Sequence, residues 1–219
     1  MSNKTFDGII FDLDGTLWDA RKSICGTWNK VLREHFPHLG QLTVEHFNQQ
    51  MGKLLPDIGR SLFPQEPEDS IDRLLELCCS EENEYIRHHG GELFEGLEEM
   101  LERLSRDAKL YIVSNCQSGY IEAFFEAHGL ENYFADIQDS GAPGSCKANN
   151  IKEVVRRNGI CRPVYVGDTH LDGESSREAG VPFIWANYGF GNTVEYDDIA
   201  MSVSELPEVC SRLAARLYS

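Results

Sequence analysis

The sequence predicts an α/β protein with a parallel sheet and an all-helical insert near its N-terminus. Short apolar runs alternate with amphipathic helical patterns over most of the 219 residues, and this is the order of βα units in a parallel sheet. Residues 18–89 break the alternation, because they contain helical patterns and no good strand. The insert is therefore expected to lie between the first strand and the rest of the α/β part.

The strands of the sheet are expected where short apolar runs occur between helical patterns. These runs are Gly8–Leu13, Leu110–Ser114, Asp136–Asp139, Val164–Val166, Phe183–Trp185 and Ile199–Met201. Helices are expected where apolar residues recur three and four positions apart, over residues 97–104, 121–128 and 206–217. A helix is also expected to begin near Asn149, with Lys147 at its head. Inside the insert, the same spacing predicts helices around Trp28 and around residues 71–78.

Composition excludes two classes of partner. The net charge is −16, and nucleic-acid binding depends on lysines and arginines that neutralise phosphates, so DNA and RNA are not expected partners. No apolar run is long enough to cross a bilayer, and the polar N-terminus does not resemble a signal peptide. The seven cysteines include no C-x-x-C pair, which is typical of reduced thiols. A cytoplasmic location is expected.

Two acids follow the first strand directly. Asp12 and Asp14 come after the apolar residues 8–11. Side chains two apart on a strand point the same way, so both carboxylates are expected to face one site. That site would lie at the carboxyl edge of the sheet, where open α/β sheets bind ligands. Gly15 permits the tight turn that the chain must make there.

Further polar residues follow other strands and are expected at the same edge. They are Ser114, Asn115, Lys147, Asp168 and Asp172. Carboxylates close together are costly unless a cation lies among them. Mg²⁺ is the natural candidate, because it takes hard oxygen ligands and keeps waters that substrate oxygens can replace. An EF-hand is excluded, since the glycine is at the fourth and not the sixth position counted from Asp12, and Ser23 stands at the twelfth position, where the loop needs glutamate.

Four stretches match the motifs of a known family in order. They are residues 11–17 (FDLDGTL), residues 112–115 (IVSN), Lys147 and residues 166–172 (VGDTHLD). On these residues the sequence resembles the haloacid dehalogenase-like hydrolase superfamily, in its helical-cap subgroup and closest to the phosphoglycolate phosphatase-like members. The resemblance implies a Rossmann-like core of residues 1–17 and 90–219 and a helical cap domain of residues 18–89.

The resemblance also implies roles for the acids. Asp12 would be the nucleophile that forms an aspartyl-phosphate. Asp14 would protonate the leaving alcohol and later take a proton from the attacking water. Mg²⁺ would be held by Asp12, the backbone carbonyl of Asp14 and Asp168, with Asp172 as a supporting residue or a further ligand. Dehalogenases displace halide and need neither a leaving-group acid nor a metal, so the second aspartate and the acidic fourth motif favour a phosphatase.

The remaining implied roles concern the substrate. Ser114, the Asn115 backbone and Lys147 would hold the phosphoryl oxygens. The cap would close over the site and favour a small phosphorylated metabolite, and Lys53 is a candidate to reach inward and meet a substrate anion. A monomer or a homodimer is expected.

Three alternatives to the phosphatase stay open at this point. A phosphomutase of the β-phosphoglucomutase type would retain the phosphoryl group and return it to the substrate. A phosphonate hydrolase would need a cap lysine that forms a Schiff base, and Lys53 is the available one. A non-catalytic binding protein would keep the fold without turnover, but the intact residues Asp12, Asp14, Lys147 and Asp168 argue against it.

Overall fold

A six-stranded sheet forms the centre of the computed structural model, which describes residues 5–141 and 146–218. Its strands run in the order β5-β4-β1-β6-β7-β8, and every neighbouring pair is parallel. Their bounds are β1 (Gly8–Phe11), β4 (Lys109–Val113), β5 (Phe134–Gln138), β6 (Pro163–Gly167), β7 (Phe183–Ala186) and β8 (Asp198–Ala200). The predicted parallel α/β fold is confirmed.

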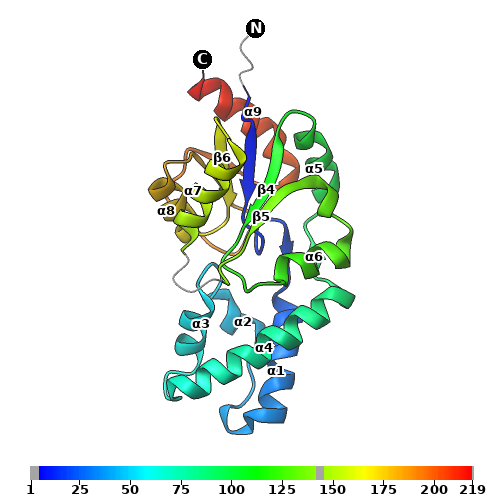
Figure 1. Ribbon diagram of the computed structural model, residues 1–219, viewed down its shortest axis with the longest axis vertical. Coiled ribbons are helices and arrows are strands. Elements are labelled where there is room, and N and C mark those ends of the chain that lie inside the picture. The colour runs from blue at the N-terminus through cyan, green and yellow to red at the C-terminus, as the bar shows by residue number, and fades with distance from the viewer. Residues whose placement is uncertain (1–4, 142–145, 219) are drawn as a thin grey trace.

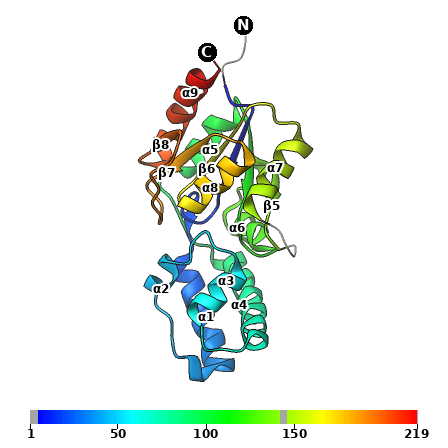
Figure 2. The same ribbon diagram turned by 90° about the vertical axis from the view of Figure 1, so that its left-hand side faces the viewer.

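Helices cover both faces of this sheet because its strands are apolar on both sides. Ile9 and Phe11 of β1 pack into one cluster with α5 (Leu97–Ser105), α6 (Tyr120–His128) and α9 (Leu206–Leu217). Ile10, which points the other way, packs into a second cluster with α7 (Lys147–Asn158). The helix α8 (His170–Ala179) lies beside α7 on that second face (Figure 2).

The helical insert forms a layer of its own. It consists of α1 (Arg21–His35), η1 (Pro37–Leu39), α2 (Val44–Asn48), α3 (Leu55–Leu62) and α4 (Glu68–His89). These helices lie together at the end of the molecule away from both chain termini (Figure 1). Trp28 and Phe47 are buried between them with their rings edge to face, so the insert has an apolar interior.

The expectation of no strand between residues 18 and 89 is wrong at its first residues. The two-residue strand β2 (Trp18–Asp19) pairs antiparallel with β3 (Glu92–Leu93), where the chain enters and leaves the helical insert. A strand of two residues is too short to produce a period-two pattern, so the sequence contains no signal for it. Short 3₁₀ turns also occur at η2 (Glu131–Tyr133) and η3 (Val203–Glu205).

The first strand is shorter than expected, and a turn follows it directly. The strand ends at Phe11, two residues before Leu13, and the backbone then bends through Gly15 with φ +81°. A side chain at Gly15 would lie 2.4 Å from Oδ2 of Asp168, so glycine is required both for the dihedral angle and for space. Among the described residues, none of the helices is long and apolar enough to cross a membrane.

Candidate active site

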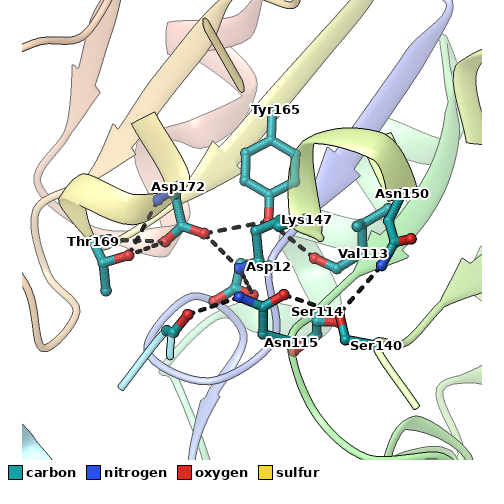
Figure 3. A network of polar contacts seen from close by, with 11 residues as sticks. Asp12, Val113, Ser114, Asn115, Ser140, Lys147, Asn150, Tyr165, Thr169 and Asp172 are labelled. Carbon is teal, nitrogen blue, oxygen red and sulfur yellow. Dashed lines mark hydrogen bonds and ion pairs between the residues drawn. The ribbon is translucent and has the colours of Figure 1, made fainter. Parts of the chain in front are cut away.

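The loops at the carboxyl ends of the central strands bring the predicted polar residues together. Asp12 follows β1, Ser114 follows β4, Asp168 follows β6, and Lys147 begins α7. All four are at least 96% buried. Figure 3 shows Asp12 and Lys147, which come from separate elements, pointing toward one another, with Ser114 nearby. These residues lie close together because a parallel sheet places the carboxyl ends of neighbouring strands at one edge.

Lys147 bridges two carboxylates at the centre of this cluster. Its Nζ donates to Oδ1 of Asp12 at 2.7 Å and to Oδ1 of Asp172 at 2.6 Å, as Figure 3 shows. Burial alone would lower the pKa of Lys147, but the two carboxylates hold it well above its ordinary value. The lysine is therefore a fixed positive charge beside Asp12.

Asp172 has both carboxylate oxygens engaged. Its Oδ2 accepts hydrogen bonds from the backbone N–H of Thr169 at 2.9 Å and from Oγ1 of Thr169 at 2.7 Å. Its Oδ1 accepts from Lys147 and, at 3.4 Å, from the hydroxyl of Tyr165. Thr169 in turn caps α8 through the Asp172 N–H. The helix cap thus fixes the carboxylate that orients Lys147.

Asp168 has one oxygen engaged and one without a partner. Its Oδ2 accepts from the N–H groups of Phe190 at 2.7 Å and Gly191 at 3.1 Å. Its Oδ1 is buried and has no hydrogen-bond partner. Burial, followed by the charges of Asp172 and Asp12, raises the pKa of Asp168 well above its ordinary value. A buried carboxylate oxygen without a partner is costly, and a cation would satisfy it.

The acids are also spaced for a metal ion. Asp12, Asp168 and Asp172 each offer an oxygen, and these atoms lie within 4.8 Å of one another. An all-oxygen donor set of this kind suits Mg²⁺. The donor chemistry and the unpartnered oxygen of Asp168 therefore fit the ion that the sequence predicts.

Asp14 lies apart from that acidic group and has a different partner. The hydroxyl of Tyr120, the first residue of α6, donates to Oδ1 of Asp14 at 3.0 Å. Burial, followed by the charge of Asp12, raises the pKa of Asp14 to about 8. Burial raises the pKa of Asp12 only to about 6, because Lys147 opposes the shift. Of the two acids, Asp14 keeps its proton more readily.

A cavity of about 70 Å³ opens between the sheet edge and the helical insert. The sheet side contributes Asp12, Asp14, Ser114, Asn115 and Tyr120, among others, and the helical side contributes residues that include Trp28, Lys53 and Glu82. A site shared by both parts of the chain is enclosed only while the two are in contact.

Two predicted residues make contacts across or beside this cavity. The Asn115 side chain donates to the carbonyl of Gly52 at 2.8 Å and so connects the two parts of the chain. Lys53 lies next to that contact, and its Nζ donates to Oε1 of Gln50 at 3.1 Å. The structure places Lys53 in the cavity wall, and its contact with a substrate anion stays a prediction.

Sequence reasoning missed two residues of the cavity, Glu82 and Tyr120. Glu82 had a usable signal, because it lies four positions after Cys78 and four before Ile86, on the buried stripe of α4. A carboxylate on an apolar stripe indicates a buried acid with a specific partner. Tyr120 had no such signal, since an aromatic residue that begins an apolar helix is equally typical of a core residue.

The fold and the site together define a class of protein, the α/β enzymes with an acidic site at the carboxyl edge of a parallel sheet. A family model described as "Haloacid dehalogenase-like hydrolase" matches residues 9–186 of the chain. The chain belongs to this family and is a hydrolase.

Curated relatives are similar over most of their length. A phosphoglycolate phosphatase of Rhodobacter capsulatus is 28% identical over 194 residues, covering 84% of this chain and 86% of the relative. A phosphoglycolate phosphatase of Mesorhizobium japonicum is 28% identical over 233 residues, covering 95% of each chain.

Solved structures share the fold. A haloacid dehalogenase-like family hydrolase from Streptococcus pneumoniae superposes with a TM-score of 0.80 at 24% identity, covering 94% of this chain and 98% of the other. A predicted phosphoglycolate phosphatase from Haemophilus somnus superposes with a TM-score of 0.82 at 17% identity, covering 95% and 99%. At these identities the likeness extends to the fold alone.

Proposed function

We propose that this hydrolase is a Mg²⁺-dependent phosphatase that cleaves a small phosphomonoester through an aspartyl-phosphate on Asp12. The observation that carries the proposal is the buried Asp12 carboxylate, which lies beside the fixed charge of Lys147 and within 4.8 Å of the acids at 168 and 172. A nucleophilic carboxylate, a neighbouring cation and a metal-binding donor set are the parts that phosphoryl transfer to aspartate needs.

Asp12, Asp168 and the backbone carbonyl of Asp14 would hold the metal. Bound Mg²⁺ would neutralise charge on the phosphoryl group and reduce the repulsion among the carboxylates. We assign Asp172 to the support of Lys147, because its oxygens contact that lysine, Tyr165 and the residue that caps α8. The unpartnered Oδ1 of Asp168 favours that residue over Asp172 as a ligand.

The chemistry takes two steps at one phosphorus atom. In the first, an oxygen of Asp12 bonds to phosphorus while the bond to the alcohol oxygen breaks, and Asp14 gives its proton to that oxygen. In the second, Asp14 takes a proton from the water that attacks phosphorus, which releases Asp12 and inorganic phosphate. Ser114, the Asn115 N–H and Lys147 would contact the phosphoryl oxygens throughout.

The helical insert would act as the cap of this site. We assign residues 18–89 to the cap domain and residues 1–17 and 90–219 to the core. The small cavity of about 70 Å³ favours a small phosphorylated metabolite over a protein substrate, and closure would exclude water. The relatives named phosphoglycolate phosphatase support the phosphomonoester class.

Metal removal tests the proposal most directly. We expect the protein to hydrolyse p-nitrophenyl phosphate with added Mg²⁺, to lose at least about 99% of that rate in excess EDTA, and to regain it when Mg²⁺ is restored. Released phosphate and nitrophenolate are measured together at each stage. Equal rates with EDTA and with Mg²⁺ would overturn the metal dependence. With a sugar phosphate as the substrate instead, isomerised product without released phosphate would favour the phosphomutase.

Replacement of the Tyr120 hydroxyl tests how Asp14 is positioned. In Tyr120→Phe, Asp14 loses its partner at 3.0 Å, and hydrogen bonds to ionisable groups contribute about 1.5–3 kcal/mol. We expect kcat for p-nitrophenyl phosphate to fall about tenfold to a hundredfold with little change in KM. Tyr133→Phe, which removes a hydroxyl that contacts Glu98 at the surface, is the matched control. An equal rise of KM in both variants would contradict a positioning role.

A further inference from the structure

A third carboxyl group borders the cavity, and this one comes from the helical insert. Glu82 of α4 is 4% exposed, and its oxygens accept hydrogen bonds from Nε1 of Trp28 at 2.7 Å and Nε2 of Gln117 at 2.9 Å. Burial raises its pKa to about 7. Each oxygen has one such donor and retains a further lone pair, so the group can accept another hydrogen bond.

Glu82 lies on the Asp14 side of the cavity. Gln117, its partner from the sheet side, is three residues before Tyr120, whose hydroxyl contacts Asp14. The charge of Glu82 also raises the pKa of both Asp14 and Tyr120, after burial and the nearer acids. Figure 1 shows α4 running alongside α6, the helix that carries Tyr120. The proposed general acid and Glu82 therefore face the same part of the substrate.

Lys53, the positively charged residue of the cavity wall, has different neighbours from Glu82. Among the lining residues that the structure describes, Lys53 is the one lysine or arginine. It follows Gly52, whose carbonyl accepts from Asn115, and its Nζ is bonded to Gln50. Lys53 is thus next to the contact of Asn115, whose backbone is assigned to the phosphoryl group, whereas Glu82 is on the side of Tyr120 and Asp14.

We infer that Glu82 determines specificity by accepting a hydrogen bond from a group at the end of the leaving alcohol remote from phosphorus. The substrate therefore carries a hydroxyl or an ammonium group at that end and not a carboxylate. The inference rests on the proposed phosphatase activity and narrows its substrate class. A hydroxyl or ammonium group would satisfy the buried carboxyl oxygens. A carboxylate would face the like charge of ionised Glu82, which a buried site disfavours strongly.

Four phosphate esters of matched size test this inference. They are 2-hydroxyethyl phosphate, 2-aminoethyl phosphate, propyl phosphate and phosphoglycolate, which differ only at the end of the leaving group. We expect kcat/KM for at least one of the first two to exceed that for phosphoglycolate at least tenfold and that for propyl phosphate severalfold. The first two esters distinguish a neutral donor from a cationic one.

Variants of Glu82 assign the preference to its carboxyl group. In Glu82→Gln and Glu82→Met, we expect the ratio of kcat/KM between the preferred ester and phosphoglycolate to fall at least fivefold. Glu84→Gln is the matched control on the same helix, because its side chain is 68% exposed, and it should keep the wild-type ratio. Thermal unfolding of each variant shows whether the fold is retained.

Other outcomes overturn the inference without touching the proposed function. These are a wild-type preference for phosphoglycolate, no turnover of either donor-bearing ester while p-nitrophenyl phosphate is hydrolysed, or an unchanged ratio when Glu82 is replaced. In the last case all four esters would slow equally, and Glu82 would serve only to join α4 to the core. Failure of Mg²⁺-dependent p-nitrophenyl phosphate hydrolysis would instead refute the phosphatase itself.

Discussion

Asp12→Asn is expected to lower kcat for p-nitrophenyl phosphate by at least about a thousandfold, which corresponds to about 4 kcal/mol of transition-state free energy. A carboxamide cannot form the acyl-phosphate, so the covalent route is lost. The fold should persist, because Lys147 keeps its second carboxylate partner, Asp172, at 2.6 Å. The loss of kcat in Asp12→Asn would therefore come from the missing nucleophile and not from unfolding.

Rapid acid quenching during turnover measures the same step directly. Wild-type protein should carry a phosphoryl group on the peptide that contains Asp12, and the variant should carry none. Asp57→Asn is a suitable control, because that side chain is 61% exposed and lies on α3. It should match the wild type in rate and in labelling. Full activity in Asp12→Asn would refute the nucleophile.

Lys147→Met is expected to lower the free energy of unfolding by about 3–5 kcal/mol in metal-free protein, the usual cost of removing one partner from a buried ion pair. The lysine is 3% exposed and bridges Asp12 and Asp172. Without it, two buried carboxylates would face each other with no cation between them. Phosphatase activity should also fall at least about a hundredfold, because the charge that we propose to contact the phosphoryl oxygens is lost.

Urea unfolding monitored by circular dichroism, with EDTA present, measures this loss. Lys152→Met is the control from the same helix: its side chain is 47% exposed and lies 3.9 Å from Glu178, so a change within about 0.5 kcal/mol is expected. Adding Asp172→Asn to Lys147→Met should recover part of the stability, since one of the opposed charges is removed. A loss below about 1 kcal/mol for Lys147→Met would contradict the bridging role.

The sequence alone determined the features that depend on neighbouring residues and on chain order. Apolar runs between helical patterns predicted the parallel sheet, and the polar residues that follow these runs predicted a site at its carboxyl edge. This works because parallel strands bring their ends to one edge whatever the details of packing. Asp12, Ser114, Lys147 and Asp168 therefore gather where the sequence predicts, although β1 ends earlier than expected and a turn, not the strand, carries Asp14.

The tertiary structure decided which partner each polar group has. Thr169 and Tyr165 hold Asp172 in place, Tyr120 contacts Asp14, and Gln117 joins the insert to the core through Glu82. The Gln117–Glu82 pair depends on how the helical insert packs on the core, and the Tyr120–Asp14 pair depends on how α6 packs beside the turn after β1. Partners 35 and 106 positions apart leave no periodic trace in the sequence. Motifs locate the reacting groups because the chemistry restricts their residue types. The groups that we propose to select the substrate come from packing between distant segments, and only the folded chain identifies them.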